Sequence, residues 1–562
     1  MAEPEPSLIR RQWRAGRAGL GDALRAVRER GGRQIRFWFI ALLIGIVAGF
    51  AALFFRKGIE ALQAFLYGTD DILRLHSFVE TLPWYWVVLI PTAGGLAVGL
   101  LMHLVTGQGR VHGVADVIEG AALHRGRVAE RAGFASALAS FITLSSGGSS
   151  GREGPVVHLA AVLSSYTSRL IRADGITARD LMGCAVAAAV SASFNAPIAG
   201  ALFALEVVLR HFAVHAFAPI VIASVAGTVI NRLEFGDVTE FRLATEDALA
   251  FYIELPAFLL LGLLCGVVAA LFMRSIFLAE DWADHLGART RLPGVLRPAL
   301  AGLLLGLLAT GYPHIIGVGY ETIEAALTGQ LLLHEAIVFC ALKIVAVAIT
   351  LGGRMGGGVF SPSLMVGALT GLGFGIVATA LLPEYSGSAT LYALAGLGAV
   401  TAAVLGAPIS TTLIVFELTG DWQTGLAVMV SVSLSTALAS KLVDRSFFLT
   451  QLERRGVHLW RGPQAYLLAL YSVADVMRPV GEGPREPDEL ILWDLVDKGL
   501  ALAPEATLEV ALPMLEASDE PHLPVLGRTA DGEPRLVGAL HLVDALRVYN
   551  RALAATAAEE HS

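Results

Sequence analysis

The sequence predicts an all-α polytopic membrane protein whose helices are broken and tilted, followed by a small cytoplasmic α/β domain. Three observations predict this fold class: the composition, glycine-rich breaks between apolar runs, and an internal repeat. The chain has 562 residues, of which 55% are hydrophobic and only 16% charged, whereas soluble proteins carry about a quarter charged residues. Charges gather in residues 1–36 and after residue 444. Between them, apolar runs such as 37–55 and 84–104 approach the roughly 20 residues that span a bilayer.

Both ends of the chain are predicted to lie in the cytoplasm. Segment 1–36 is rich in arginine and directly precedes the first apolar run, and further arginines follow the last one. Basic residues beside membrane spans favour the cytoplasmic side, so we expect an even number of crossings. The short apolar core of a cleaved signal peptide is missing. Arginine outnumbers lysine, which favours a bacterial inner membrane, and the net charge of −8 gives no indication of a nucleic-acid partner.

Several classes of chemistry are not indicated. Cys184, Cys265 and Cys340 all lie inside apolar runs, where cysteine acts as a small hydrophobic residue rather than a disulfide partner. The spans contain no metal-spaced cluster of histidine and carboxylate and no nucleophile–base pair. We therefore expect no enzyme activity, no metal and no resident cofactor in the membrane body.

Glycine and proline clusters interrupt the apolar runs at Ser145–Pro155, Phe194–Pro197, Leu351–Pro362 and Gly406–Pro408. Inside a bilayer, broken backbone is tolerated only where it is buried in protein or lines a watery cavity. The breaks therefore predict a transporter-like body with an internal polar site.

An internal repeat indicates where in the chain that polar site lies. NAPIAGALFALE at 195–206 resembles GAPISTTLIVFE at 406–417, and each follows a glycine-rich break ending in proline, GGSSGREGP (147–155) and GGRMGGGVFSP (352–362). Corresponding broken segments in two halves are the best sequence pointer to the binding site of a duplicated transporter.

Helix starts at such breaks favour anions. The first N–H groups of a helix lack intrahelical partners, and the helix dipole adds about half a positive charge there. Several converging starts would bind an anion without a fixed positive charge that holds it too tightly to leave. Glycine lets the backbone itself approach the ion.

GREGP at 151–155, GGVFSP at 357–362 and NAPIAG at 195–200 together resemble the signature elements of the CLC family of chloride channels and chloride/proton antiporters. The resemblance covers residues 37–456, which we take as the transport domain. It implies a homodimer in a lipid bilayer, each subunit having its own pore for chloride and related anions between two inverted repeats. It further implies that Glu153 is the gate. The alternative is that Glu153 forms a salt bridge with the neighbouring Arg152.

The resemblance also implies the anion-binding residues. The backbone near Gly151, Arg152 and Gly154 would serve an outer ion, and that of Val359 and Phe360 a central ion. Two positions depart from the family pattern. His112, before Gly113, stands where a serine or other polar residue is usual, and either donates to the ion or faces a vestibule without touching it. Phe448 (or Phe447, if the alignment shifts by one) stands where a tyrosine hydroxyl commonly completes the site.

A third departure concerns the mechanism. Proton-coupled relatives place an internal acid directly after the position of Glu206, where this chain has Val207. We therefore expect channel-like or weakly proton-coupled anion conduction, with Glu206 either a structural acid or a substitute proton route. Alternatives are a chloride/proton antiporter, a fluoride-selective exporter and, from a different class, a cation-coupled solute symporter.

Residues 457–562 have an ordinary soluble composition. SVADVMRP at 472–479 and the segments after Ala506 resemble one CBS-type regulatory module, with the order strand, helix, strand, strand, helix. Such modules usually bind adenosine nucleotides in pairs, and Asp544 lies where the ribose-contacting acid would fall. A purely structural, dimer-stabilising role is the alternative.

Overall fold

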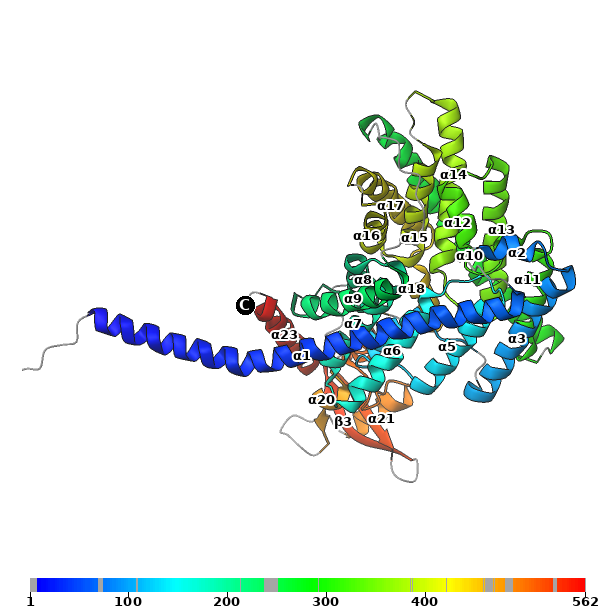
Figure 1. Cartoon of the computed structure of the whole chain (residues 1–562). Coiled ribbons are helices and arrows are strands. Elements are labelled where there is room, and N and C mark those ends of the chain that lie inside the picture. Colours follow the sequence, from blue (N-terminus) through cyan, green and yellow to red (C-terminus); the bar gives the residue numbers. More distant parts are fainter. Residues whose placement is uncertain are drawn as a thin grey trace, which may run out of the picture.

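A computed structural model gives the fold of the chain, which is predominantly helical (Figure 1). The structure describes the backbone of residues 8–68, 74–107, 110–212, 214–236, 251–291, 293–384, 386, 388–420, 422–457, 459, 468, 471–480, 489–528 and 533–560.

The first half of the described structure runs from residue 8 to residue 236. Its elements are α1 (Leu8–Tyr67), α2 (Leu75–Val79), α3 (Trp84–Thr106), α4 (Val114–Leu123), α5 (Glu130–Ser145), α6 (Glu153–Leu170), α7 (Gly175–Phe194), α8 (Pro197–Phe203), the π-helix η2 (Ala204–Leu209) and α9 (Val214–Phe235). Although the sequence suggested a separate segment 1–36, α1 passes through that boundary without a break.

The second half contains the corresponding elements in the same order. They are α10 (Phe251–Thr290), α11 (Leu296–Ala309), the 3₁₀ turn η3 (Pro313–Ile315), α12 (Tyr320–Leu327), α13 (Leu333–Gly352), α14 (Phe360–Leu381), α15 (Ala389–Leu405), α16 (Pro408–Thr419), α17 (Trp422–Leu442) and α18 (Phe447–Glu453). Equivalent pairs pack in the two halves: α1 on α9 as α10 on α17, and α6 on α7 as α14 on α15. This confirms the predicted repeat of broken helices.

Eight described helices are long and apolar enough to cross a membrane by length and composition. Four further apolar segments are shorter: 197–209, 296–309, 389–405 and 408–419. The breaks follow from local sequence, because α8 and α16 both begin at a proline, which suits the first helical position. The helix before each one ends at a residue in the left-handed conformation, Asn195 or Gly406.

Small residues let the central helices approach closely. A Cβ atom on Gly367 of α14 would lie 2.4 Å from the carbonyl oxygen of Gly396 on α15. Membrane helices without a hydrophobic driving force between them depend on such close contacts. The same core buries Cys184 and Cys265, and all three cysteines are free.

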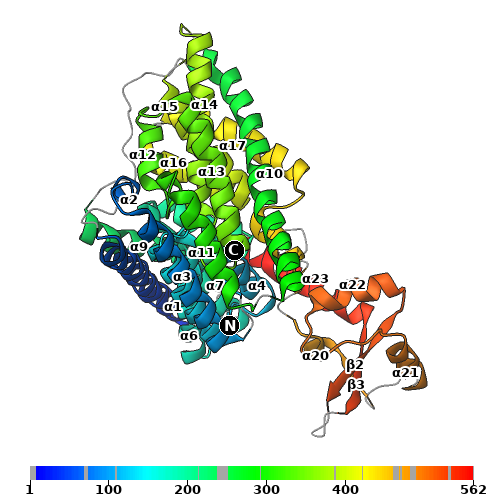
Figure 2. The same cartoon turned by 90° about the vertical axis from the view of Figure 1, so that its right-hand side faces the viewer.

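The carboxyl-terminal part forms a small α/β unit beside the membrane body (Figure 2). Its elements are α20 (Val473–Val476), β1 (Arg478–Pro479), α21 (Glu489–Asp497), α22 (Leu508–Ser518), β2 (His522–Arg528), β3 (Pro534–His541) and α23 (Leu542–Glu560). The antiparallel sheet has the order β1-β3-β2. The expected strand–helix–strand–strand–helix order is present, but the first strand has only two residues and α21 is an additional helix. The expected loop at 480–488 lies almost wholly outside the described residues.

Candidate anion-binding site

The starts of α6 and α14 meet at the centre of the membrane body. Gly151 donates its N–H to the carbonyl oxygen of Gly358 at 2.7 Å, and Gly358 donates back to Gly151 at 2.9 Å. This antiparallel bridge joins the two glycine-rich breaks found in the sequence. Neither helix start has a side-chain cap. Because the bridge joins the two starts, the positive ends of both helix dipoles lie close together.

Several backbone N–H groups at these starts remain available. Within the described part of the chain, those of Glu153 and Gly154 on α6 and of Val359, Phe360 and Ser361 at the start of α14 have no hydrogen-bond acceptor. The ring of Phe360 is fixed from behind, with its centroid 4.6 Å from that of Phe194 and 5.8 Å from that of Phe203. The N–H of Gly151, by contrast, is consumed by the bridge to Gly358. Of the glycines predicted to serve the outer ion, only Gly154 still offers an N–H.

The Glu153 side chain lies against the start of the opposite helix. It is 1% exposed, and its Oε2 has no hydrogen-bond donor among the described residues. A Cβ atom built on Gly151 would lie 2.8 Å from this Oε2 and 3.0 Å from the backbone nitrogen of Ser361. The carboxylate therefore sits beside the first turn of α14, where an anion would be favoured.

The predicted alternative for Glu153 was a salt bridge with Arg152. The Nε atom of Arg152 lies 3.9 Å from Glu153 Oε1, which is a long ion pair. A shorter contact comes from Tyr320, whose hydroxyl donates to the same Oε1 at 3.1 Å. Tyr320 is a contact that the sequence did not predict.

Two cavities flank Glu153. The Arg152 cavity, about 290 Å³, is lined by Arg152, Tyr320, Arg56, His76, His314 and Glu321 among others. The Gly154 cavity, about 340 Å³, is lined by His112, Gly113, Gly154, Gly358, Val359 and Phe448 among others. Glu153 lines neither cavity, but its two chain neighbours line one cavity each, Arg152 the first and Gly154 the second.

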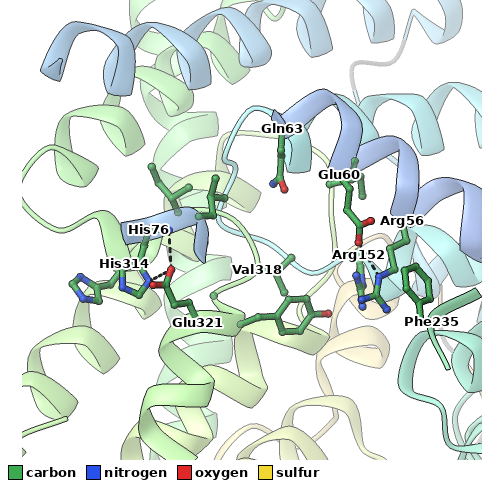
Figure 3. Close-up of a pocket in the computed structure, with 14 residues that line it drawn as sticks. Arg56, Glu60, Gln63, His76, Arg152, Phe235, His314, Val318 and Glu321 are labelled. Carbon is green, nitrogen blue, oxygen red and sulfur yellow. Dashed lines mark hydrogen bonds and ion pairs between the residues drawn. The ribbon is translucent and has the colours of Figure 1, made fainter. Parts of the chain in front are cut away.

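The Arg152 cavity carries charges of both signs (Figure 3). Arg56 and Arg152 both line this cavity, and Arg56 Nε is 2.9 Å from Glu60 Oε1. At the other end His76 Nδ1 lies 2.9 Å from Glu321 Oε2.

His112 and Gly113 line the Gly154 cavity, but their backbone is already used. The N–H of His112 donates to Ser136 Oγ at 2.9 Å, and that of Gly113 to Asp116 Oδ2 at 2.8 Å. Only the imidazole of His112 remains for an ion, and its Nδ1 lies 3.6 Å from Asp116 Oδ1.

Asp116 holds two arginine side chains in place, and the sequence did not reveal this role. It pairs with Arg110 and, at 3.2 Å, with Arg455. Both arginines, together with Arg354, line the Gly154 cavity, where Glu280 is the acidic lining residue. Basic groups that outnumber the acidic ones along a cavity favour anions.

Phe448 and Phe447 both line the Gly154 cavity at the start of α18, and each is 5% exposed. Phe447 stacks on Phe277 with ring centroids 5.1 Å apart, and Phe448 packs edge-on against Phe447 with centroids 5.9 Å apart. Neither supplies a hydroxyl.

We predict that Phe448→Tyr tightens anion binding, because it adds a hydroxyl donor to the cavity wall. A hydrogen bond to a charged partner contributes about 1.5–3 kcal/mol, so chloride should bind roughly tenfold more tightly, as measured by isothermal titration calorimetry. Phe447→Tyr is the matched control and should change little. A stronger effect at Phe447 than at Phe448 would mean that the two positions are exchanged.

Glu206 lies away from both cavities and caps the other repeat. Its Oε1 accepts from the N–H of Ile409 at 2.9 Å, and its Oε2 from the N–H and the hydroxyl of Ser410, both at 2.8 Å. Glu417 accepts in return from the N–H groups of Ile198 and Ala199 at 2.9 and 2.8 Å. The two repeat glutamates thus cap each other's helix starts, on α16 and α8.

Val207 follows Glu206 within η2 and is 5% exposed. A π-helical turn is rare and often marks a functional position. Here it carries Val207, the residue that the motif resemblance aligns with the internal acid of proton-coupled relatives.

The carboxyl-terminal unit shows no open ribose contact at Asp544. Its carboxylate accepts from Arg478 Nε at 2.7 Å and lies 2.9 Å from Arg547 Nη1. In the part of the chain that the structure describes, no group of three histidine, cysteine, aspartate or glutamate side chains is suited to hold a metal ion.

The fold defines a membrane protein with two related halves, in which the glycine-rich breaks before α6 and α14 meet at the bridge between Gly151 and Gly358. Comparison with known proteins agrees. The sequence profile described as "Voltage gated chloride channel" matches residues 94–440. A ClcB-like chloride channel protein of Ralstonia nicotianae is 34% identical over 396 residues, which cover 70% of this chain and 91% of the relative.

Solved structures have the same fold. A slow cyanobacterial Cl⁻/H⁺ antiporter aligns with a TM-score of 0.65 and 21% identity, covering 75% of this chain and 98% of the neighbour. A eukaryotic CLC transporter aligns with a TM-score of 0.64 and 18% identity, covering 91% of this chain and 98% of the neighbour. The chain belongs to the CLC family of voltage-gated-type chloride channels and transporters, which confirms the resemblance seen in its motifs. It is an integral membrane protein of an anion-transporting family rather than an enzyme family.

Proposed function

We propose that this protein conducts chloride and related small anions across the membrane through a pore that Glu153 closes. The observation that carries the proposal is the position of the Glu153 carboxylate. It is buried next to the uncapped start of α14, and its chain neighbours Arg152 and Gly154 line two separate cavities. A carboxylate inside a membrane body is expensive and marks function by default, and here it occupies a place that favours any anion.

The mechanism follows from competition for that place. Arg110, Arg354 and Arg455 draw anions into the Gly154 cavity. The N–H groups of Gly154, Val359 and Phe360 then replace the hydration of the ion with partial positive charges, which release it readily. The ionised Glu153 carboxylate competes with the anion for the last step. Protonation of Glu153, or its displacement by an anion, opens the path to the Arg152 cavity.

We propose channel-like or weakly proton-coupled conduction rather than strict antiport. Val207 cannot carry a proton, and Glu206 is engaged by three hydrogen bonds from α16. The test is a proteoliposome assay that follows chloride and proton movement together. Chloride flux without stoichiometric proton movement supports the proposal, whereas uphill proton movement driven by a chloride gradient would show an antiporter.

Two alternatives stay within the family. The cyanobacterial neighbour is a Cl⁻/H⁺ antiporter, so the proton measurement decides that question for this chain. Fluoride preference depends on fine geometry at the N–H groups, and parallel fluxes of chloride, fluoride and nitrate separate it. Family membership sets the cation-coupled symporter aside.

We assign Glu206 and Glu417 a structural role, because each closes the helix start of the opposite repeat. Glu417→Gln should lower the thermal unfolding temperature while leaving chloride flux per folded molecule unchanged. A glutamine amide brings a donor against the N–H of Ile198 or Ala199, and a lost hydrogen bond to a charged group costs about 1.5–3 kcal/mol. Melting in detergent and flux measure the two effects.

Glu206→Gln is the matched variant for this prediction. A structural acid gives the same pattern as Glu417→Gln. A change in proton flux with Glu206→Gln alone would instead support the substitute proton route.

We further propose a homodimer in a bacterial inner membrane with both termini in the cytoplasm. The arginine-rich amino terminus supports the orientation. Exposed apolar side chains on α8, α9 and α16, such as Ile198 (54%) and Ile409 (47%), offer a surface to lipid or a second subunit. We assign the carboxyl-terminal CBS-like unit a structural role, because Asp544 is already paired with two arginines.

A further inference from the structure

Tyr320 is the first residue of α12 and connects the second half of the chain to the Glu153 carboxylate. Its hydroxyl donates to Glu153 Oε1 at 3.1 Å, and its side chain lines the Arg152 cavity. Among the described side chains, Tyr320 is the one whose hydroxyl donates to the proposed gate, Glu153.

The Tyr320 ring is held in place by Arg152. The Arg152 Cζ atom lies 4.9 Å from the centroid of the ring, within the range of a cation–π contact. Arg152 directly precedes Glu153, so the ring and the carboxylate are oriented by neighbouring residues of one helix start.

The backbone that carries Tyr320 is fixed from two sides. The N–H of Gly317 donates to the carbonyl oxygen of Gly147 at 3.0 Å, which ties this loop to the break before α6. From α13, the fully buried Lys343 ammonium donates to the carbonyl oxygens of Gly317 at 2.8 Å and Ile315 at 3.3 Å. Gly319, with φ of +93°, makes the turn into α12. Tyr320 is therefore a rigidly placed donor.

We propose that Tyr320 is a positioning residue of the gate. Its hydroxyl stabilises the ionised Glu153 carboxylate in the closed position and so sets how readily a proton or an anion displaces it. The inference rests on the proposed function, since it assigns the residue that tunes the same gate. A preorganised donor aimed at a charge stabilises that charge without reorganisation of its surroundings, and removal of the hydroxyl should weaken the closed state without disturbing the amides of the anion site.

The test is Tyr320→Phe, which keeps the ring over Arg152 and removes only the donor. Chloride flux in proteoliposomes is measured as a function of pH. Without the donor the ionised carboxylate is less stable, so Glu153 takes up its proton more readily. The pH of half-maximal flux should then move upward by about one unit, a roughly tenfold change in proton affinity, and flux at neutral pH should rise several-fold. The exposed Tyr312 (42%) supplies the control Tyr312→Phe, which should leave the profile unchanged.

The double variant Tyr320→Phe/Glu153→Gln identifies where the hydroxyl acts. If it acts through the Glu153 carboxylate, the two changes together should equal Glu153→Gln alone. An equal effect of Tyr320→Phe in both backgrounds overturns the inference. An unchanged pH profile in Tyr320→Phe also overturns the inference. If Glu153→Gln still abolishes the pH dependence of flux in that case, the proposed function stands. If neither Tyr320→Phe nor Glu153→Gln alters chloride flux, both the inference and the proposed function are wrong.

Discussion

Glu153→Gln should make chloride flux independent of pH and raise it at neutral pH by roughly tenfold, equivalent to about 1.4 kcal/mol. Glutamine keeps the shape of a protonated carboxyl but carries no charge, so nothing competes with the anion for the start of α14. The wild-type protein should conduct more as the medium is acidified, because protonation removes the competing charge. Proteoliposome flux between about pH 4.5 and about pH 7.5 measures both curves.

Glu60→Gln is the control for this prediction. Glu60 lines the Arg152 cavity and pairs with Arg56 at 2.9 Å, but it does not lie between the cavities. The chloride flux of Glu60→Gln should depend on pH in the same way as that of the wild type. If Glu153→Gln retained the full pH dependence, the gate would have to be sought elsewhere, and the proposed mechanism would be wrong.

The features of the fold that the sequence predicted are those encoded locally. Glycine and proline clusters end helices through their own backbone chemistry. The starts of α6 and α14 could therefore be predicted from the sequence. Duplication left a second copy of each break, which distinguished a site from an accidental loop. The meeting of Gly151 with Gly358 required the tertiary structure, since 207 residues separate them along the chain.

The features that the sequence did not reveal are contacts between distant segments. Tyr320 and Glu153 are 167 residues apart, and no spacing rule joins them. The only local signal was the glycine-flanked run before α12. The role of Glu206 was left open for the same reason: the repeat showed two lone glutamates, but only the structure shows that each caps the helix of the other.

Hydrogen-bond competition explains why some predicted site residues no longer offer their backbone. The N–H groups of Gly113, His112 and Gly151 are each paired with a protein acceptor. Sequence reasoning identified glycine-rich starts correctly but could not decide which amides the protein uses for its own bridges. The amides left over, which include those of Gly154, Val359 and Phe360, lie on both repeats. We infer that the anion is shared between the two halves.

Gly357→Ala should abolish chloride flux and sharply lower the thermal stability of the protein. Gly357 has φ of +124°, a region that residues with a Cβ atom rarely adopt. A Cβ atom there would lie 2.1 Å from Ser150 Oγ and 2.4 Å from Ser150 Cβ, closer than atoms can pack. Backbone strain of this kind costs about 1–3 kcal/mol, and the clash adds to it by pushing apart the breaks before α6 and α14. Flux per folded molecule and thermal unfolding in detergent are the measurements.

Gly373→Ala, on the α14 helix that follows this break, is the matched control. Its added Cβ atom would meet only Leu333 Cδ1 at 3.8 Å, an ordinary contact, and alanine is the better helix former by about 1 kcal/mol. It should leave flux and stability intact. The double variant Gly357→Ala/Ser150→Gly removes the clash but keeps the backbone strain, so it should recover only part of the stability. Full activity of Gly357→Ala alone would contradict the account, because the bridge between Gly151 and Gly358 brings the two helix starts together and leaves no room for a side chain beside it.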